Sequence, residues 1–211
     1  MAIKRSWMVF KPLVFITSLL PLGWLIFALY SDTVLGTKYM TADPIQKLDR
    51  ELGDWALILI IISLTVRPLA EIFKKGELVA YRRMIGLFAF FYVCLHLSAY
   101  VGLNLQLDID EFIKDITKRI FITIGIITFT LLLPLAITST KGMIKRIGGK
   151  SWQKLHMLIY PISLLGVFHF YMMVRADFTR PSIYLAIILV LLGYRIWAKR
   201  KKSRPKKVAA A

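Results

Sequence analysis

The chain contains three histidines, and all three fall in strongly apolar stretches. His96, His156 and His169 each lie inside or at the edge of a run long enough to cross a bilayer. Ionisable side chains at membrane depth are costly unless paired, which makes them functional candidates. No Asp or Glu lies in the inner part of any of these runs, which disfavours a transporter that relies on a carboxylate relay. Neutral imidazoles from neighbouring helices are typical axial ligands of a haem iron.

The spacing of the histidines predicts two depths in the membrane. His156 and His169 are 13 residues apart, so one helix separates them by about 20 Å. His96 lies about as far from the start of its run, near Met84, as His169 lies from the start of its own, near Leu155. We therefore expect His96 and His169 to be the axial pair in one half of the membrane. His156 is expected as a ligand or haem-edge residue near the opposite surface.

An arginine stands where a fourth histidine would complete a second pair. Arg82 precedes His96 by 14 residues, which on a helix returns to within about 40° of the same face. Arginine stays protonated and does not bind iron, but it pairs well with carboxylate or phosphate. Arg82 is therefore a candidate partner for a haem propionate or a flavin phosphate, together with Arg83 and Lys150 in the same basic loops.

The fifth apolar run poses a geometric problem for this scheme. Thirteen residues on a straight helix leave His156 and His169 about 140° apart. Pro161 lies between them and is a possible site of a kink, which leaves open whether both rings meet the same neighbour. The only cysteine is Cys94, which excludes an intramolecular disulfide and a Cys-rich cluster. Without a Cys-x-x-Cys-His motif, any haem is expected to be of the b type.

These residues must be positioned by an all-α membrane bundle. The chain has 211 residues, is 57% hydrophobic and carries a net charge of +17. A high hydrophobic content and a high net charge are compatible if the apolar segments lie in lipid and the charges lie in the loops. A soluble nucleic-acid binder would instead be polar throughout. Six runs are long enough to span a bilayer; they are residues 12–30, 55–73, 84–107, 120–140, 155–174 and 181–198. We expect one transmembrane domain over residues 1–211, with a signal anchor first and a basic tail at residues 199–211.

The loop charges predict the orientation of this bundle. One set of flanks holds 21 of the 29 basic residues, and the opposite loops hold ten of the 12 acidic residues. The positive-inside rule then places both termini in the cytoplasm. The acidic outer face has two readings, a by-product of insertion topology or a docking surface for a soluble partner. The tail fits an anchor at the lipid surface, and no nucleic-acid partner is expected.

Three stretches of the sequence resemble the bacterial MsrQ (YedZ) family. They are Tyr81–Leu87, Leu95–Tyr100, and the run from Ile137–Thr140 to Gly149–His156 with Tyr160. The wider group is the ferric-reductase-like transmembrane domain, whose members carry two histidines on each of two helices. This sequence keeps His156 and His169 on one helix but only His96 on the other, with Arg82 at the remaining position.

The resemblance implies a haem-binding membrane subunit of a periplasmic methionine sulfoxide reductase system. Such a subunit would sit in the bacterial inner membrane and take electrons from the quinone pool or a cytoplasmic flavin reductase. It would pass them to a soluble molybdopterin subunit, MsrP, as an electron-transfer partner rather than as the catalytic subunit. The family also implies FMN beside one haem b or two. Two alternatives stay open, namely a membrane subunit of a ferric or other metal reductase and a small transporter with a histidine-lined path.

Overall fold

The described part of the chain contains six helices that are long and apolar enough to cross a membrane, which confirms the predicted all-α, six-span class. The computed structural model describes residues 10–203, so most of the expected tail lies outside the described residues. The membrane helices are α2 (Lys11–Val34), α3 (Pro44–Ile72), α4 (Val79–Ala99), α6 (Ile120–Ile137), α9 (Ile159–Met173) and α10 (Thr179–Ser203). Shorter elements join or extend them: η1 (Gly76–Leu78), η2 (Tyr100–Asn104), α5 (Ile109–Lys118), α7 (Lys141–Ile147), α8 (Gly149–Leu155) and η3 (His156–Leu158).

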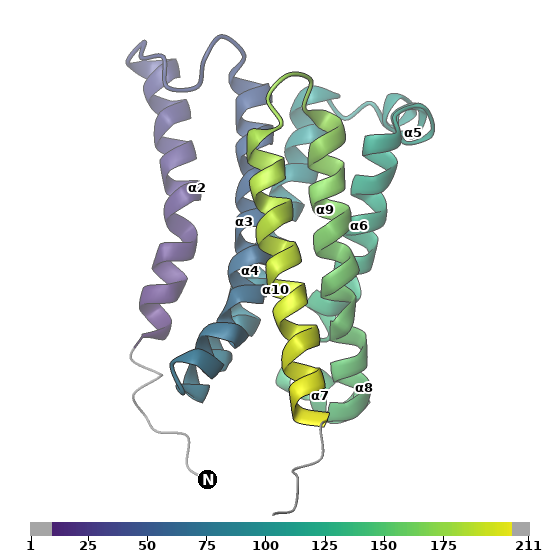
Figure 1. Cartoon of the computed structure of the whole chain (residues 1–211). Coiled ribbons are helices and arrows are strands. Elements are labelled where there is room, and N and C mark those ends of the chain that lie inside the picture. The colour runs from purple at the N-terminus through teal and green to yellow at the C-terminus, as the bar shows by residue number, and fades with distance from the viewer. Residues whose placement is uncertain (1–9, 204–211) are drawn as a thin grey trace, which may run out of the picture.

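The six spans run side by side, so the bundle has two distinct ends (Figure 1). The start of α2 and the end of α10 lie at the same end, together with α7 and α8. We call this the inner end, and we call the end that carries α5 the outer end. The assignment of the inner end to the cytoplasm stays a prediction from the loop charges.

Local signals explain where several helices begin. The side chains of Asp43, Asp108 and Thr140 each accept a hydrogen bond from the backbone N–H three residues later, and so cap α3, α5 and α7. Pro44 follows the first cap at a position where proline is favoured. Helix α3 therefore begins 11 residues before Trp55, the predicted start of the span. The added segment is about three turns long and carries the charged residues of this helix that precede the apolar run.

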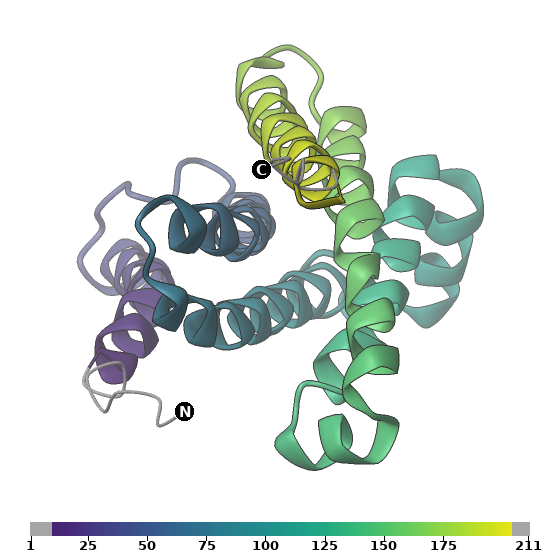
Figure 2. The same cartoon turned by 60° about the horizontal axis from the view of Figure 1, so that its bottom comes forward.

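Helix α3 forms the centre of the bundle. Its apolar window is 56% buried, the largest fraction among the six spans. It packs chiefly on α4, while α6 packs on α9, and α10 contacts both α9 and α3. Figure 2 shows α2 beside α3 and α4, on the far side from α6. The other spans expose many large apolar side chains, as expected for helices that face lipid.

Tyr92 holds the peripheral helix α2 against α4. Its side chain is fully buried, and its hydroxyl donates to the Ser18 carbonyl (2.9 Å) while accepting from the Leu22 amide (3.0 Å). Ser18 and Leu22 are four residues apart, so the hydroxyl bonds to a carbonyl and an N–H that a regular α-helix would join to each other. Pro21 lies beside this point and is the reason that the ladder opens there.

The fifth span is not one continuous α-helix. Helix α8 ends at Leu155, the 3₁₀ turn η3 spans His156–Leu158, and α9 begins at Ile159. Pro161 in the first turn of α9 has no N–H to donate, which favours a break at this point. Three residues at about 120° instead of about 100° reduce the predicted angle between His156 and His169 from about 140° to about 80°. Both rings accordingly meet the same neighbouring helix. His169 contacts Phe121 in α6, and His156 contacts Thr138, the residue that follows α6.

Candidate functional site

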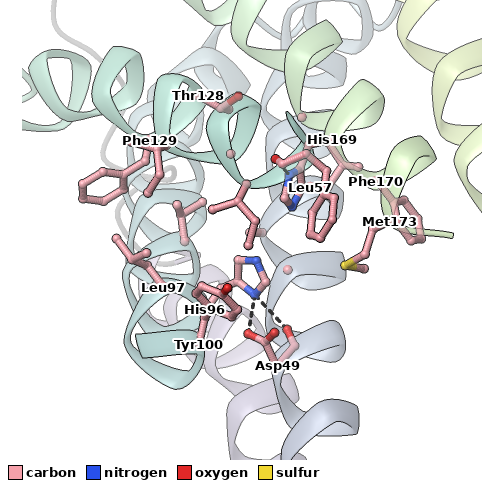
Figure 3. Close-up of a pocket in the computed structure, with 18 of the residues that line it drawn as sticks. Asp49, Leu57, His96, Leu97, Tyr100, Thr128, Phe129, His169, Phe170 and Met173 are labelled. Atoms are coloured by element: carbon pink, nitrogen blue, oxygen red, sulfur yellow. Dashed lines mark hydrogen bonds and ion pairs between the residues drawn. The ribbon is translucent and has the colours of Figure 1, made fainter. Parts of the chain in front are cut away.

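His96 projects from α4 near the outer end, and α3 fixes its orientation. Its Nδ1 lies 2.9 Å from the backbone carbonyl of Asp49, to which it donates a hydrogen bond, and 2.8 Å from Oδ1 of the same residue. Figure 3 shows both contacts on one side of the ring, with the other nitrogen directed away from Asp49. The carboxylate is 14% exposed. Asp49 therefore holds one nitrogen of His96 and leaves Nε2 available.

His169 is held in a similar way by a different helix. It lies on α9, and its Nδ1 donates to the backbone carbonyl of Phe121 on α6 at 2.6 Å. Metal-bound histidines almost always donate their second ring N–H to a carbonyl or a carboxylate, which fixes the tautomer. Both histidines have this arrangement in the structure. Each ring thus presents Nε2 as its free nitrogen.

The structure brings the predicted pair together. The ring centroids of His96 and His169 are 6.2 Å apart. Two metal–nitrogen bonds of about 2 Å, with about 1.1 Å from each nitrogen to its ring centroid, would place the centroids of two axial imidazoles about 6.2 Å apart. The observed separation therefore suits a single iron held between the two rings.

A large apolar cavity surrounds the two rings. It has an empty volume of about 1120 Å³, part of it open to the outside. Its walls come from α3, α4, α6 and α9 and are mostly aliphatic or aromatic; they include Leu57, Ile60, Val93, Phe129 and Phe170. Among the described residues there is no group of three or more His, Cys, Asp or Glu that would hold a bare metal ion. Two imidazoles in an apolar cavity instead fit a metal whose other ligands come from a macrocycle.

Polar side chains line the outer rim of this cavity. Asp54, five residues after Asp49, lines the cavity and pairs with Arg180 at 3.3 Å. On the opposite side the Tyr100 hydroxyl donates to Asp115, whose carboxylate also pairs with Arg119 at 2.9 Å. The second network ties α5 to the π-helical turn η2, which directly follows α4.

His156 is not part of this pair. It lies in η3 toward the inner end, where its ring stacks on Trp152 with centroids 3.9 Å apart. Its Nε2 is 3.1 Å from the Thr138 hydroxyl. That hydroxyl donates to the Pro134 carbonyl at 2.6 Å, so His156 is the donor in the shared contact. A ligand role for His156 stays a prediction, and with this contact in place only Nδ1 would be available for it.

Arg82 and Arg195 lie close to Tyr160 at the inner end. Arg82 is half-buried and interacts with the Tyr160 hydroxyl. Arg195 donates to the same hydroxyl at 2.6 Å and to the Leu64 carbonyl at 2.8 Å, while its Nε is buried without a partner. The Leu64 carbonyl is open to this donor because Pro68, four residues later, has no N–H for it.

Arg83 and Lys150, the other two basic residues predicted to bind a propionate or phosphate, do not join this cluster. Arg83 and Lys150 are both exposed, and the structure does not gather them with Arg82. Sequence reasoning also missed residues that matter at the outer site, namely Asp49, Gly53, Phe121 and Gly125. The only signal for them in the sequence was the spacing of Asp49 and Gly53, which places both on one face of a helix, one turn apart.

Comparisons with known proteins agree with the geometry. Residues 52–167 match a family model described as ferric reductase like transmembrane component. The chain is 46% identical to a protein of Caulobacter vibrioides named protein-methionine-sulfoxide reductase heme-binding subunit MsrQ, over 92% of this chain and 90% of that protein. A protein of the same name from Herminiimonas arsenicoxydans is 44% identical over 92% and 88%. The magnetosome protein MamZ of Paramagnetospirillum magneticum is 45% identical over 88% of this chain but only 29% of its own length.

Proposed function

Because this chain belongs to the MsrQ family of ferric-reductase-like membrane proteins, we propose that it is the haem-binding electron-transfer subunit of a bacterial protein-methionine-sulfoxide reductase system. The observation that carries the proposal is the facing pair His96 and His169, whose centroids are 6.2 Å apart and whose Nδ1 atoms are both held by backbone carbonyls.

The residues of the outer site have distinct roles in this proposal. His96 and His169 would hold the iron through Nε2, while the carbonyls of Asp49 and Phe121 hold the Nδ1 atoms. A bound b-type haem supplies a one-electron carrier that bare side chains do not provide. The apolar walls exclude water and keep the local dielectric low. The polar rim at Asp54, Tyr100 and Asp115 lies where electrons would leave toward an outer partner.

The direction of electron flow follows from the position of this site. The pair lies near the outer end of the bundle, so electrons from the quinone pool or a cytoplasmic flavin reductase would enter from the inner end. They would leave to a periplasmic molybdopterin subunit, MsrP, which would form a heterodimer with this chain. The acidic outer loops provide a surface for that partner. The chain would then act as the redox subunit, with methionine sulfoxide reduced on the partner.

We further propose one haem b per chain, with FMN at the inner end. Arginine does not ligate iron, so Arg82 does not complete a second pair with His156. The half-buried guanidinium groups of Arg82 and Arg195, next to Tyr160, instead suit a phosphate or carboxylate group. Arg83 and Lys150 are exposed and would contribute only to the electrostatic field of this end.

The absorption spectrum of the purified full-length protein tests the main proposal. A dithionite-reduced minus oxidised spectrum should show b-type bands at one haem per chain. His96→Ala and His169→Ala should each lose most of the haem, while His156→Ala should keep the bands because its ring contacts Trp152 and Thr138 and is not part of the facing pair. A parent protein without b-type bands would refute the electron-transfer function and favour a transporter. Co-purification with a periplasmic molybdoenzyme would separate the proposed role from a metal reductase.

A further inference from the structure

Helices α3 and α6 present the same local pattern to the two facing histidines. On α3 the carbonyl of Asp49 accepts from His96, and Gly53 follows four residues later. On α6 the carbonyl of Phe121 accepts from His169, and Gly125 again follows four residues later. Two helices from different parts of the chain thus each combine a carbonyl with a glycine one turn away.

The two glycines lie directly against the imidazole rings. A Cβ added at Gly53 would lie 3.2 Å from Cε1 and 3.3 Å from Nδ1 of His96. A Cβ added at Gly125 would lie 3.0 Å from Cε1 and 3.1 Å from Nδ1 of His169. These separations are too short for carbon against an aromatic ring at optimal distance, about 3.5–4.0 Å. A methyl group at either position would therefore displace the ring.

The geometry of a helix explains why glycine stands at these positions. Each Cα–Cβ bond in a helix tilts toward the N-terminus, so a side chain covers the turn that precedes its own Cα. A side chain at position 53 or 125 would thus lie over the carbonyl of Asp49 or Phe121. Without that side chain, an imidazole from the neighbouring helix can reach the flank of the carbonyl. Glycine also weakens a helix relative to alanine, so its presence at both positions calls for a reason of this kind.

The other glycines of the membrane helices do not contact an imidazole. A Cβ at Gly23, Gly102 or Gly193 would meet nothing within 4 Å. At Gly166, which lines the same cavity, it would lie 3.4 Å from the Leu57 side chain. The contact with a histidine ring is thus specific to Gly53 and Gly125 among the described glycines. Gly86 offers a matched control, because an added Cβ there would lie 3.8 Å from the Ser63 hydroxyl and Gly86 does not line the cavity.

We propose that Gly53 and Gly125 are positioning residues for the axial histidines. Each glycine opens the approach of one imidazole to a backbone carbonyl four residues earlier. That contact keeps the proton on Nδ1, sets the rotation of the ring and directs Nε2 toward the iron. The inference rests on the proposed haem-binding function, because it assigns the glycines through the rings of His96 and His169.

Alanine substitutions in the full-length protein test this assignment. Gly53→Ala and Gly125→Ala should lower the number of haems per chain, shift the low-spin EPR signal of the remaining haem and shift its midpoint potential. The shift should be larger for Gly125→Ala, where the contact is shorter. Gly86→Ala, on the same helix as His96 but outside the cavity lining, should leave all three quantities at the parental values. Parental values in both Gly53→Ala and Gly125→Ala would overturn the inference, while parental b-type bands would still support the proposed function.

A double substitution keeps the test decisive if a single variant accumulates poorly. In a His169→Ala background the ring that meets position 125 is gone, so Gly125→Ala should no longer lower the amount of folded protein recovered from membranes. An equal loss with and without the ring would show that the methyl group clashes with something else and would overturn the assignment. Gly53→Ala in a His96→Ala background provides the same comparison for the other ring.

Discussion

The imidazole planes of His96 and His169 are inclined to each other by 77°, close to perpendicular. Each ring is held by a different helix, His96 by α3 and His169 by α6. The angle is therefore set by two independent contacts and does not depend on either ring alone. It bears directly on the electronic structure of an iron between the rings.

We expect the oxidised protein to give a strongly anisotropic low-spin EPR signal. Two nearly perpendicular imidazole planes leave the two iron d orbitals that interact with them close in energy, and this raises the largest g value. Continuous-wave EPR at low temperature on the purified protein measures it. A well-resolved rhombic signal, which parallel imidazole planes produce, would contradict the observed geometry.

Substitution of Asp49 should raise the midpoint potential of the haem. The carboxylate lies 2.8 Å from Nδ1 of His96, where it makes the imidazole a stronger donor and so favours the oxidised iron. Asp49→Asn should raise the potential by on the order of 50 mV, because about 59 mV corresponds to a tenfold change for one electron. A redox titration followed by absorbance measures this. Glu51→Gln is the matched control, since Glu51 pairs with Lys47 on the same helix and should leave the potential unchanged.

Loss of the Tyr92 hydroxyl should loosen α2. Tyr92→Phe removes both hydrogen bonds to the opened turn of α2 and leaves its shape otherwise unchanged. We expect a loss of about 0.6–2 kcal/mol in unfolding free energy, in line with interhelical hydrogen bonds measured in membranes. Thermal unfolding in detergent measures it, with Tyr30→Phe as a control at an exposed position. Equal stability of the two variants would mean that the turn closes on itself when the hydroxyl is gone.

The inner arginines should be needed for flavin but not for haem. Arg82→Gln removes a half-buried guanidinium from the site beside Tyr160, so we expect several-fold less FMN per chain and an unchanged b-type spectrum. Flavin fluorescence after denaturation measures FMN directly. Arg83→Gln is the control, since this neighbouring arginine is exposed. An equal effect of the two substitutions would indicate that only the net charge of the inner end matters.

Depth in the membrane was predictable from the sequence, whereas side-chain partners were not. The rise per residue is the same on every helix, so counting from the helix ends placed His96 and His169 at one level. Which neighbour a face meets depends on packing between helices, and hydropathy carries no information about that. Asp49 thus appeared only as one acidic residue of an outer loop, although α3 extends far enough to bring it to His96. The 3₁₀ turn at His156 was likewise hidden in a continuous apolar run.

The contact between Arg195 and the Leu64 carbonyl links two positions far apart in the chain. Pro68 removes the backbone donor for that carbonyl, and Arg195 on α10 supplies a replacement. Positions 68 and 195 should consequently covary among homologues, because a residue with a free N–H at position 68 makes the guanidinium dispensable. In an engineered version of this chain, the two positions would have to be redesigned together.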